Sequence, residues 1–354
     1  MRAWQVTRHG SPIKALELQE ISEPVPSSGE ILVRTSASVC NYNEVDCCHG
    51  RYLTVNPPLP YTLGMEFVGE VIDAGPGSEE WVGRRVVASA RGAIGAHADV
   101  AVAPVAMAFE APPTLTDAEA AALFFPFHLA YLGLHERGRL QPGETVLVHA
   151  AAGGVGSAAV QLAVAAGARV IATAGSPEKV QFVKELGADV AIDYRSCDFA
   201  EAVLEHTNNA GVDVCFDGVG GDVTMRSLQC LRRGGRHLVV GFANGIEAEE
   251  VPIVSGRVLC FGNFDIVGVI LSYVDFGDLA DAGVDITDFA PVPVPRFNPP
   301  PVELGRRVHA ELLKLLQEGR IRPVVSRVVA FHELPLALEE MESRSTIGRV
   351  VITR

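Results

Sequence analysis

A glycine-rich turn in the middle of the chain has the residue types of a phosphate-binding loop. Residues 145–149 read as a strand that runs through Ala151-Ala152-Gly153-Gly154-Val155-Gly156 into a helical segment at 157–167. In such a turn, backbone N–H groups at the start of a helix bind a diphosphate, and glycines permit the close approach. The alternative is a tight strand–helix turn in an α/β domain without a ligand. We predict dinucleotide contacts at Gly153, Gly154, Val155 and Gly156.

The residues after the next strand indicate which nucleotide binds. Sites that prefer NAD usually carry Asp or Glu roughly 20 residues after the glycines, where the carboxylate accepts from the ribose 2′-OH. Here that place holds Gly175 and Ser176, and Lys179 supplies a cation to which Arg195 could add a second. An ordinary capped helix start explains the same residues, and both interpretations can hold together. We predict NADPH, with its adenosine end near Gly175, Ser176, Lys179 and Tyr194.

Two further turns are placed at the same edge of the predicted sheet. Gly241 and Phe242 follow a strand at 236–240, at a carboxyl end where ligands of such folds collect. Their backbone groups are predicted to bind the carboxamide of the cofactor. Asp217-Gly218-Val219 ends another strand on this edge. Residues 228–235 are predicted to be the end of a helix that is closed by glycines.

The spacing of apolar residues, which indicates strands or helices, changes along the chain. Residues 1 to about 122 show short strands separated by Gly and Pro turns. From about 123 to 271, strands alternate with helical patterns, which favours a parallel sheet with crossover helices. Residues 272–304 are rich in proline and resemble a lid, a partner-binding arm or a mobile segment. A helical stripe at 303–319 and a mixed tail follow, and the tail is expected to rejoin the N-terminal domain.

Composition limits the possible partners and the compartment. The 354 residues carry a net charge of −14, which argues against nucleic acid and anionic membranes. The chain opens on a strand-like segment rather than a signal peptide, and its longest apolar stretch is too short to span a bilayer. Seven scattered cysteines without a CxxC pair suit reduced thiols. We therefore expect a cytoplasmic protein without a structural zinc site.

Together these stretches resemble the zinc-independent quinone oxidoreductase branch of the medium-chain dehydrogenase/reductases, which includes ζ-crystallin. The likeness covers nearly all of the chain except the proline-rich connection. It is carried by the following stretches: Cys40-Asn41-Tyr42-Asn43-Glu44 with Gly50-Arg51-Tyr52; 58–60 with Gly64-Met65-Glu66-Phe67-Val68-Gly69; 150–161 with 175–179 and 187–189; 217–221 with 234–236 and Gly241.

The resemblance implies an α/β protein with two domains. A β-rich GroES-like catalytic domain would be formed by both chain ends, residues 1–122 and 306–354. A doubly wound Rossmann domain would bind NADPH at 123–305, with 272–304 as its proline-rich connection. The active site would lie between the two domains. Such proteins are commonly dimers built through the edge of the Rossmann sheet, which here is the strand near 265–271.

The resemblance also places catalytic residues. Asn41 and Tyr42 would lie near the nicotinamide or the acceptor oxygen. Tyr52 aligns with a tyrosine that related enoyl-thioester reductases use to position substrate and to supply a proton. Its alternative role is structural, with the ring packed under the loop at 57–58. Glu44 replaces the more usual Asp, and it is expected to make a supporting contact rather than a catalytic one.

The positions that bind zinc in zinc-dependent relatives have mostly lost their ligands. Cys40 stands at the first ligand, but Met65 replaces the histidine and Phe125 stands near the third position. A catalytic zinc needs about three protein ligands, so no metal is expected. Cys40 is expected to be a buried small residue, and His97, His128 and His149 to be core or solvated.

These features predict an NADPH-dependent reductase that transfers hydride to a quinone or an α,β-unsaturated carbonyl. Such acceptors spread negative charge themselves, whereas oxidation of simple alcohols needs a Lewis acid. A cofactor-binding, crystallin-like protein with little turnover is the alternative, and a zinc-type alcohol dehydrogenase is a weaker one.

Overall fold

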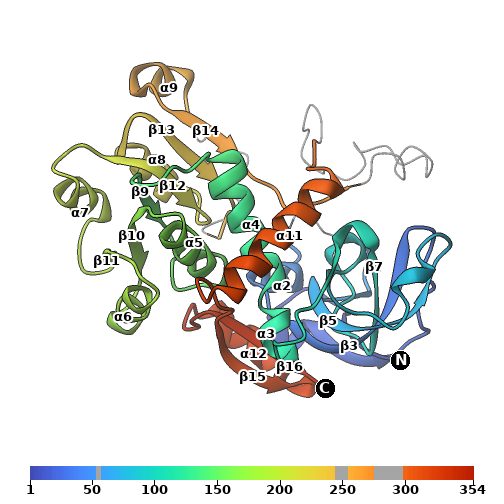
Figure 1. Ribbon diagram of the computed structural model, residues 1–354. Coiled ribbons are helices and arrows are strands. Elements are labelled where there is room, and N and C mark those ends of the chain that lie inside the picture. The colour runs from blue at the N-terminus through green and yellow to red at the C-terminus, as the bar shows by residue number, and fades with distance from the viewer. Residues whose placement is uncertain (53–56, 244–253, 275–297) are drawn as a thin grey trace. The chain divides into compact units, whose positions relative to one another are not determined.

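The computed structural model describes residues 1–52, 57–243, 254–274 and 298–354 (Figure 1). The chain divides into two compact units. Unit 1 contains Met1–Phe125, Ser272–Ala310 and Pro323–Arg354, and unit 2 contains Pro126–Leu271 and Glu311–Arg322. The predicted domain limits, which placed 272–304 with the dinucleotide-binding domain, stay a prediction. Most of that connection lies outside the described residues.

Unit 2 is built around one parallel sheet of six strands in the order β11-β10-β9-β12-β13-β14. This is the doubly wound order 3-2-1-4-5-6, in which the strand order reverses beside the first strand. The strands are β9 (Thr145–Val148), β10 (Arg169–Ala174), β11 (Val190–Asp193), β12 (Val212–Asp217), β13 (Leu231–Val239) and β14 (Asp265–Gly268). The predicted Rossmann sheet is therefore confirmed.

Short helices connect these strands and cover the sheet (Figure 1). They are α5 (Gly154–Ala165), α6 (Pro177–Glu185), α7 (Phe199–His206), α8 (Asp222–Leu228) and α9 (Gly256–Gly262). The middle of β9 is fully buried, since Val146, Leu147 and Val148 have no exposed surface. A strand that is buried on both faces needs such a continuous apolar run. Phe199 and Val203 of α7 pack with Leu147 in one apolar cluster.

The prediction of a helix end at 228–235 was wrong beyond its first residue. Helix α8 ends at Leu228, and β13 begins at Leu231. Leu231 pairs with Val212 and Arg236 with Val214, so the residues between them form a bulge in β13. Gly234 has a φ of 72° in this bulge. The glycines that suggested a helix terminus therefore serve a bulge, which needs the same left-handed backbone.

Unit 1 is rich in antiparallel strands. Seven strands form the sheet β15-β16-β3-β5-β6-β8, with β7 paired to β3, and three more form β2-β1-β4. Their bounds are β1 (Arg2–Val6), β2 (Leu16–Glu20), β3 (Glu30–Val39), β4 (Tyr61–Thr62), β5 (Glu66–Ala74), β6 (Arg85–Ser89), β7 (Val100–Pro104), β8 (Ala108–Glu110), β15 (Val325–Ala330) and β16 (Arg349–Thr353).

The two ends of the chain meet in this unit. The last strand, β16, pairs with β3 in an antiparallel register that sets Val351 opposite Val39. Helices of the unit come from both parts of the chain: α1 (Pro12–Ala15), α2 (Tyr42–His49), α3 (Asp117–Ala121) and α12 (Leu334–Glu342). Helices α4 (Phe124–Tyr131) and α11 (Val302–Gln317) each begin in unit 1 and end in unit 2. The expectation that the tail rejoins the N-terminal part is confirmed.

A buried histidine makes the stability of unit 1 depend on pH. Burial lowers the pKa of His309 to about 4, and its ring stacks on Phe109. The unfolded side chain titrates near pH 6.5, so stability present above that pH is lost as the pH falls toward 4. We expect His309→Gln to remove on the order of 2 kcal/mol of the stability difference between pH 7.5 and 4.5. Urea unfolding at both pH values measures this, and parallel curves for variant and wild type would contradict it.

Candidate active site

The glycine turn forms an anion-binding end of helix α5. The helix begins at Gly154 with Gly153 as its N-cap, and no side chain caps it. The first N–H groups of a helix have no acceptor within it, and the helix dipole favours an anion there. A Cβ on Gly156 would lie 2.3 Å from the carbonyl oxygen of Ala150, so only glycine lets the turn fold this closely. These residues fit the diphosphate of a dinucleotide.

The predicted adenosine residues converge at the carboxyl ends of β10 and β11, where Ala174 pairs with Asp193. Ser176 is the N-cap of α6, and its hydroxyl accepts the N–H of Lys179 at 3.2 Å. The phenol of Tyr194 lies over Gly175, where an added Cβ would be 2.6 Å from its oxygen. Ser176 therefore caps helix α6, as the structural interpretation predicted, and it also lies at the same end of the sheet as Gly175 and Tyr194.

Two cations, Lys179 and Arg195, lie at this corner together with Glu178 and with Asp193, whose carboxylate accepts the N–H of Arg195 at 3.0 Å. Partial burial and the nearby charge of Arg195 lower the pKa of Lys179, although Glu178 acts in the opposite direction. Arg195 follows Tyr194 just after β11, which pairs with β10, so the two cations come from neighbouring turns at this end of the sheet. Two cations beside a capping hydroxyl suit a phosphate dianion.

The two remaining cofactor positions lie beside the turn that follows β12. A Cβ on Gly241 would lie 3.2 Å from the carbonyl oxygen of Gly218, and the N–H of Ala243 donates to that oxygen at 3.2 Å. Phe242 is 41% exposed. The structure therefore brings the turns at 217–221 and 240–243 together at the carboxyl edge of the sheet, on the other side of β9 from the adenosine corner.

The predicted catalytic residues surround the start of helix α2 in unit 1. Tyr42 and Tyr52 are partly buried and pack against one apolar cluster, which includes Trp4, Val45, Tyr61 and Phe331. The side-chain amide of Asn43 donates to the Tyr52 phenol oxygen at 3.1 Å. Tyr52 thus has both the packed ring of a structural residue and a polar contact at its hydroxyl. Residues 53–56, which follow it, lie outside the described part.

The side chain of Asn41 is hydrogen-bonded to other residues of the protein. Its side-chain oxygen accepts both terminal N–H groups of Arg349 at 3.1 Å, and its side-chain N–H donates to the carbonyl of Val39 at 3.2 Å. Asn41 is also buried. A direct contact of Asn41 with nicotinamide or acceptor stays a prediction, and the structure gives it a second role as a partner of Arg349.

A buried ion pair and a buried histidine–carboxylate hydrogen bond support this region, and sequence reasoning did not find their partners. Arg349 is paired with Glu66, which also accepts the N–H of Phe125 at 3.3 Å. Burial lowers the pKa of Arg349 to about 10, although the charge of Glu44 opposes this. Glu44 accepts from the ring of His97 at 3.0 Å and from the N–H of Met65 at 3.0 Å.

His97 connects this pair to β3, because its other ring nitrogen lies 2.8 Å from the Ser38 hydroxyl. In the sequence, only the Gly64-Met65-Glu66 motif pointed to Glu66 as a residue of this region. Nothing pointed to its partner Arg349, which is 283 residues further along the chain. His97, His128 and His149 are all buried, as the core interpretation predicted.

A zinc ion does not fit these residues. Cys40 is 1% exposed, and burial, reinforced by the charge of Glu44, raises the pKa of its thiol well above the usual value. The neighbouring carboxylates are already engaged by His97 and by the guanidinium of Arg349. Among the described residues, no group of three or more His, Cys, Asp or Glu side chains could hold a metal. Zinc is held by thiolates, imidazoles and carboxylates, and the described residues do not bring three of these together here.

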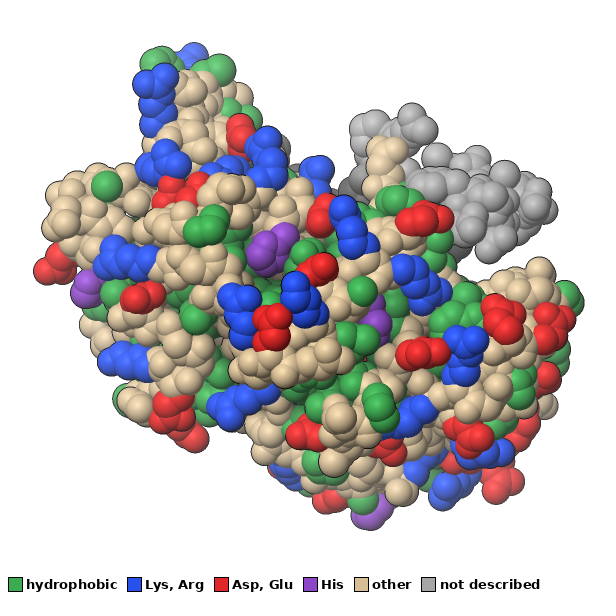
Figure 2. Space-filling view, in the orientation of Figure 1, with side chains coloured by type: hydrophobic (Ala, Val, Ile, Leu, Met, Phe, Trp, Pro, Cys, Tyr) green, Lys and Arg blue, Asp and Glu red, His purple; other side chains and the backbone are tan. Residues whose placement is uncertain are grey.

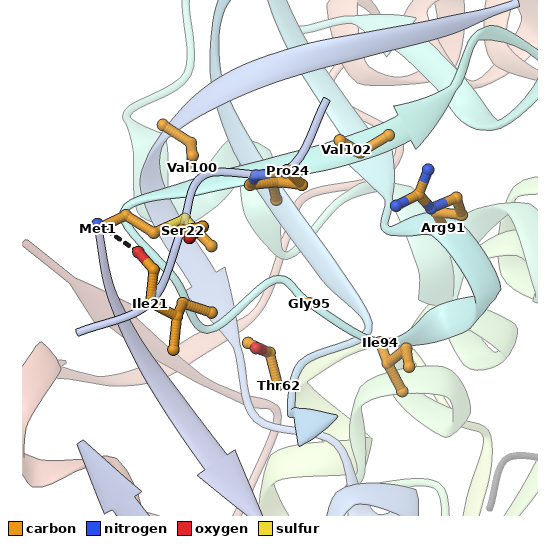
Figure 3. A pocket seen from close by; sticks show the side chains of 11 residues that line it. Met1, Ile21, Ser22, Pro24, Thr62, Arg91, Ile94, Gly95, Val100 and Val102 are labelled. Carbon is orange, nitrogen blue, oxygen red and sulfur yellow. Dashed lines mark hydrogen bonds between the residues drawn. The ribbon is translucent and has the colours of Figure 1, made fainter. Parts of the chain in front are cut away.

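A pocket of about 240 Å³ lies elsewhere in unit 1 (Figure 3). Apolar side chains from the segment that follows β2 and from β7 line it, including Ile21, Val100 and Val102, together with Arg91. Arg91 is paired with Glu30 at 3.0 Å. None of the predicted catalytic residues lines this pocket, so it is separate from the candidate active site.

Comparisons with known proteins agree with this geometry. Residues 154–283 match the family described as zinc-binding dehydrogenase, and residues 27–113 match the alcohol dehydrogenase GroES-like domain. The chain is 30% identical over 338 residues to the human synaptic vesicle membrane protein VAT-1 homolog, covering 95% of this chain and 82% of that protein.

This chain belongs to the medium-chain dehydrogenase/reductase superfamily.

Solved members of the superfamily share the fold. The Escherichia coli quinone oxidoreductase complexed with NADPH has a TM-score of 0.82 at 28% identity, covering all of both chains. The Pseudomonas syringae pv. tomato quinone oxidoreductase has a TM-score of 0.81 at 29% identity, covering 100% of this chain and 99% of that one. The resemblance inferred from the sequence and the combination of GroES-like and Rossmann domains are thus confirmed.

The surroundings of the protein concern membranes and nucleic acids. Within the described residues, no helix has both the length and the apolarity needed to cross a bilayer. Acidic and basic side chains are interspersed over the face in Figure 2. The cytoplasmic location and the exclusion of nucleic acid stay predictions.

Proposed function

We propose that this protein is an NADPH-dependent oxidoreductase that reduces quinones or α,β-unsaturated carbonyls without a metal. The observation that carries the proposal is the corner at the ends of β10 and β11, where Gly175 and Ser176 stand in place of the carboxylate of an NAD site and Lys179 and Arg195 supply cations. The NADPH complex of the similar Escherichia coli quinone oxidoreductase supports the same cofactor.

The residues of unit 2 have binding roles in this proposal. N–H groups of Gly154, Val155 and Gly156 hold the diphosphate, and the turns around Gly218 and Gly241 receive the nicotinamide end. When bound, NADPH supplies the hydride. The acceptor then needs a proton on the oxygen that gains negative charge.

Tyr52 is the proposed source of that proton. Its O–H bond breaks as the proton passes to the acceptor oxygen, and water restores the proton to the phenolate later. Hydride plus proton reduces a quinone to a hydroquinone. With an α,β-unsaturated carbonyl, hydride adds to the β-carbon and the protonated oxygen gives an enol, which becomes the saturated carbonyl when a proton leaves the oxygen and another from water adds to the α-carbon. Asn43, which donates to the same phenol oxygen, stabilises the transient phenolate.

NADPH oxidation tests the function directly. The panel contains a benzoquinone, an ortho-quinone, an enone and an enoyl thioester. We expect turnover with at least one class, and silence across the panel while NADPH binds would overturn the proposal. In that case tight binding with negligible turnover supports the cofactor-binding alternative, which the similarity to a vesicle membrane protein homologue favours. Metal analysis of the active protein tests the zinc-type alternative.

Cofactor preference depends on Lys179. We expect Lys179→Ala to raise the KM for NADPH about tenfold, because a charge-assisted contact to the 2′-phosphate contributes roughly 1.5–3 kcal/mol. The KM for NADH should hardly change. Lys184→Ala, on the exposed side of the same helix, is the matched control. Equal effects of Lys179→Ala on both cofactors would refute the 2′-phosphate assignment.

A homodimer is proposed through the edge of the parallel sheet. Strand β14 is the last strand of that sheet and is mostly exposed, and Phe261 of the preceding helix is 86% exposed. An exposed edge strand beside a large apolar side chain invites pairing with another copy. We expect Phe261→Glu to convert a dimer into a monomer in light scattering, whereas Ile13→Glu, at an exposed position in unit 1, should not. A monomeric wild type would contradict the dimer.

A further inference from the structure

The buried side chain of Asp217, at the carboxyl end of β12, contacts polar groups of three different segments. It is 1% exposed, yet it has four polar neighbours. Its Oδ1 accepts the N–H groups of Val219 at 2.8 Å and of Gly220 at 3.1 Å. Its Oδ2 accepts the Thr224 hydroxyl at 2.6 Å and lies 3.2 Å from Nε2 of His237. This carboxylate therefore fixes both the turn that follows it and the helix after the turn.

The environment keeps Asp217 charged. Burial alone would raise the pKa of its carboxyl, but His237, His149 and the Thr224 hydroxyl outweigh burial and hold the pKa well below the usual range. His237 is fully buried in β13, and neither of its ring nitrogens has a hydrogen-bond partner among the described residues, so its Nε2 meets Asp217 at 3.2 Å as an electrostatic contact outside hydrogen-bond geometry. A buried carboxylate with this many donors is rigid, since each lost contact costs a buried polar group its partner.

The turn that Asp217 fixes is in contact with the other predicted cofactor turn. The carbonyl of Asp217 accepts the N–H of Val240 at 2.8 Å, and the next carbonyl, of Gly218, accepts the N–H of Ala243 at 3.2 Å. Gly218 itself has open space where a Cβ would stand, since nothing lies within 4 Å. One buried side chain thus sets the backbone of 218–221 and, through it, that of 240–243.

Sheet topology tells which end of the cofactor these turns face. In a doubly wound sheet a dinucleotide lies across the point where the strand order reverses, here between β9 and β12. The cation corner at β10 takes the adenosine half. The nicotinamide half must then lie over the ends of β12 and β13, which are the strands that Asp217 and His237 join.

We propose that Asp217, with Thr224 and His237, is a positioning residue for the nicotinamide half of the cofactor site. It does not touch the cofactor. It holds the backbone groups at 218–221 and 240–243 in the arrangement that binds and orients the nicotinamide. This inference rests on the proposed NADPH function.

Binding of two ligands distinguishes an effect on the nicotinamide half of the cofactor site from an effect on the adenosine half. NADPH uses both halves, whereas 2′,5′-ADP carries only the adenosine and its phosphates. We expect Asp217→Ala to weaken NADPH on the order of tenfold while 2′,5′-ADP changes less than about twofold, because only the nicotinamide half loses its support. Asp213→Ala is the matched control, since Asp213 lies at the opposite end of the same strand and accepts the N–H of Thr145.

Milder variants keep the test decisive if Asp217→Ala does not fold. Thr224→Val removes one hydroxyl at nearly constant shape and should weaken NADPH about threefold without affecting 2′,5′-ADP, and Thr224→Ser should restore wild-type binding. Equal weakening of both ligands, or unchanged NADPH binding in a folded Thr224→Val protein, would overturn the positioning role. A wild-type protein that binds neither ligand would instead refute the proposed function.

Discussion

Replacing Gly156 by alanine should weaken NADPH binding by about 100-fold or more. The new Cβ would lie 2.3 Å from the Ala150 carbonyl oxygen and 2.8 Å from the Cα of Ala151, so the turn and helix α5 must move apart. Binding of a diphosphate depends on several N–H groups that point to one place, and each contributes roughly 1.5–3 kcal/mol when its partner is charged. Titration of protein or NADPH fluorescence measures the dissociation constant.

The same substitution should cost stability, about 1–3 kcal/mol as for other overpacked sites. Gly256→Ala is the matched control, because nothing lies within 4 Å of a Cβ there and the residue lies in the same unit, at the start of α9. The control should keep both NADPH binding and stability. A folded Gly156→Ala protein with wild-type affinity would show that the cofactor does not use this turn.

Replacing Tyr52 by phenylalanine should lower kcat by about 100-fold, the lower part of the range for a lost general acid. The ring remains packed against the cluster around Trp4 and Tyr61, so stability and the dissociation constant of NADPH should change little. The loss should be confined to the step in which the acceptor is reduced. Steady-state rates with a reactive acceptor, together with NADPH titration, separate these effects.

Tyr61→Phe is the matched control for Tyr52→Phe. The hydroxyl of Tyr61 donates to the carbonyl of Cys47 at 3.1 Å within the same cluster, so its loss should cost about 1 kcal/mol of stability. Its kcat should stay close to that of the wild type. If Tyr52→Phe behaves like this control, Tyr52 is structural, and the proton reaches the acceptor from another group or from water.

The sequence predicted the parts of the site that depend on local geometry. The glycine turn before α5 and the capped start of α6 at Ser176 were both visible as short patterns, because neighbouring residues determine a strand–turn–helix and a cap. Local sequence patterns gave a wrong prediction for residues 228–235, where a helix end was expected and β13 begins at Leu231. Glycines that end a helix and glycines that form a bulge adopt the same backbone, and only pairing with β12 distinguishes them.

The sequence by itself determined the order of strands and helices, the dinucleotide turn and the absence of a carboxylate after β10, because these are carried by residues close together in the chain. Only the tertiary structure decided the partners of the buried polar groups. Arg349 meets Glu66 and Asn41 only because β16 pairs with β3, and Asp217 meets His237 only because β12 pairs with β13. A buried charge shows its residue type in the sequence, but its partner is chosen by the packing of distant strands.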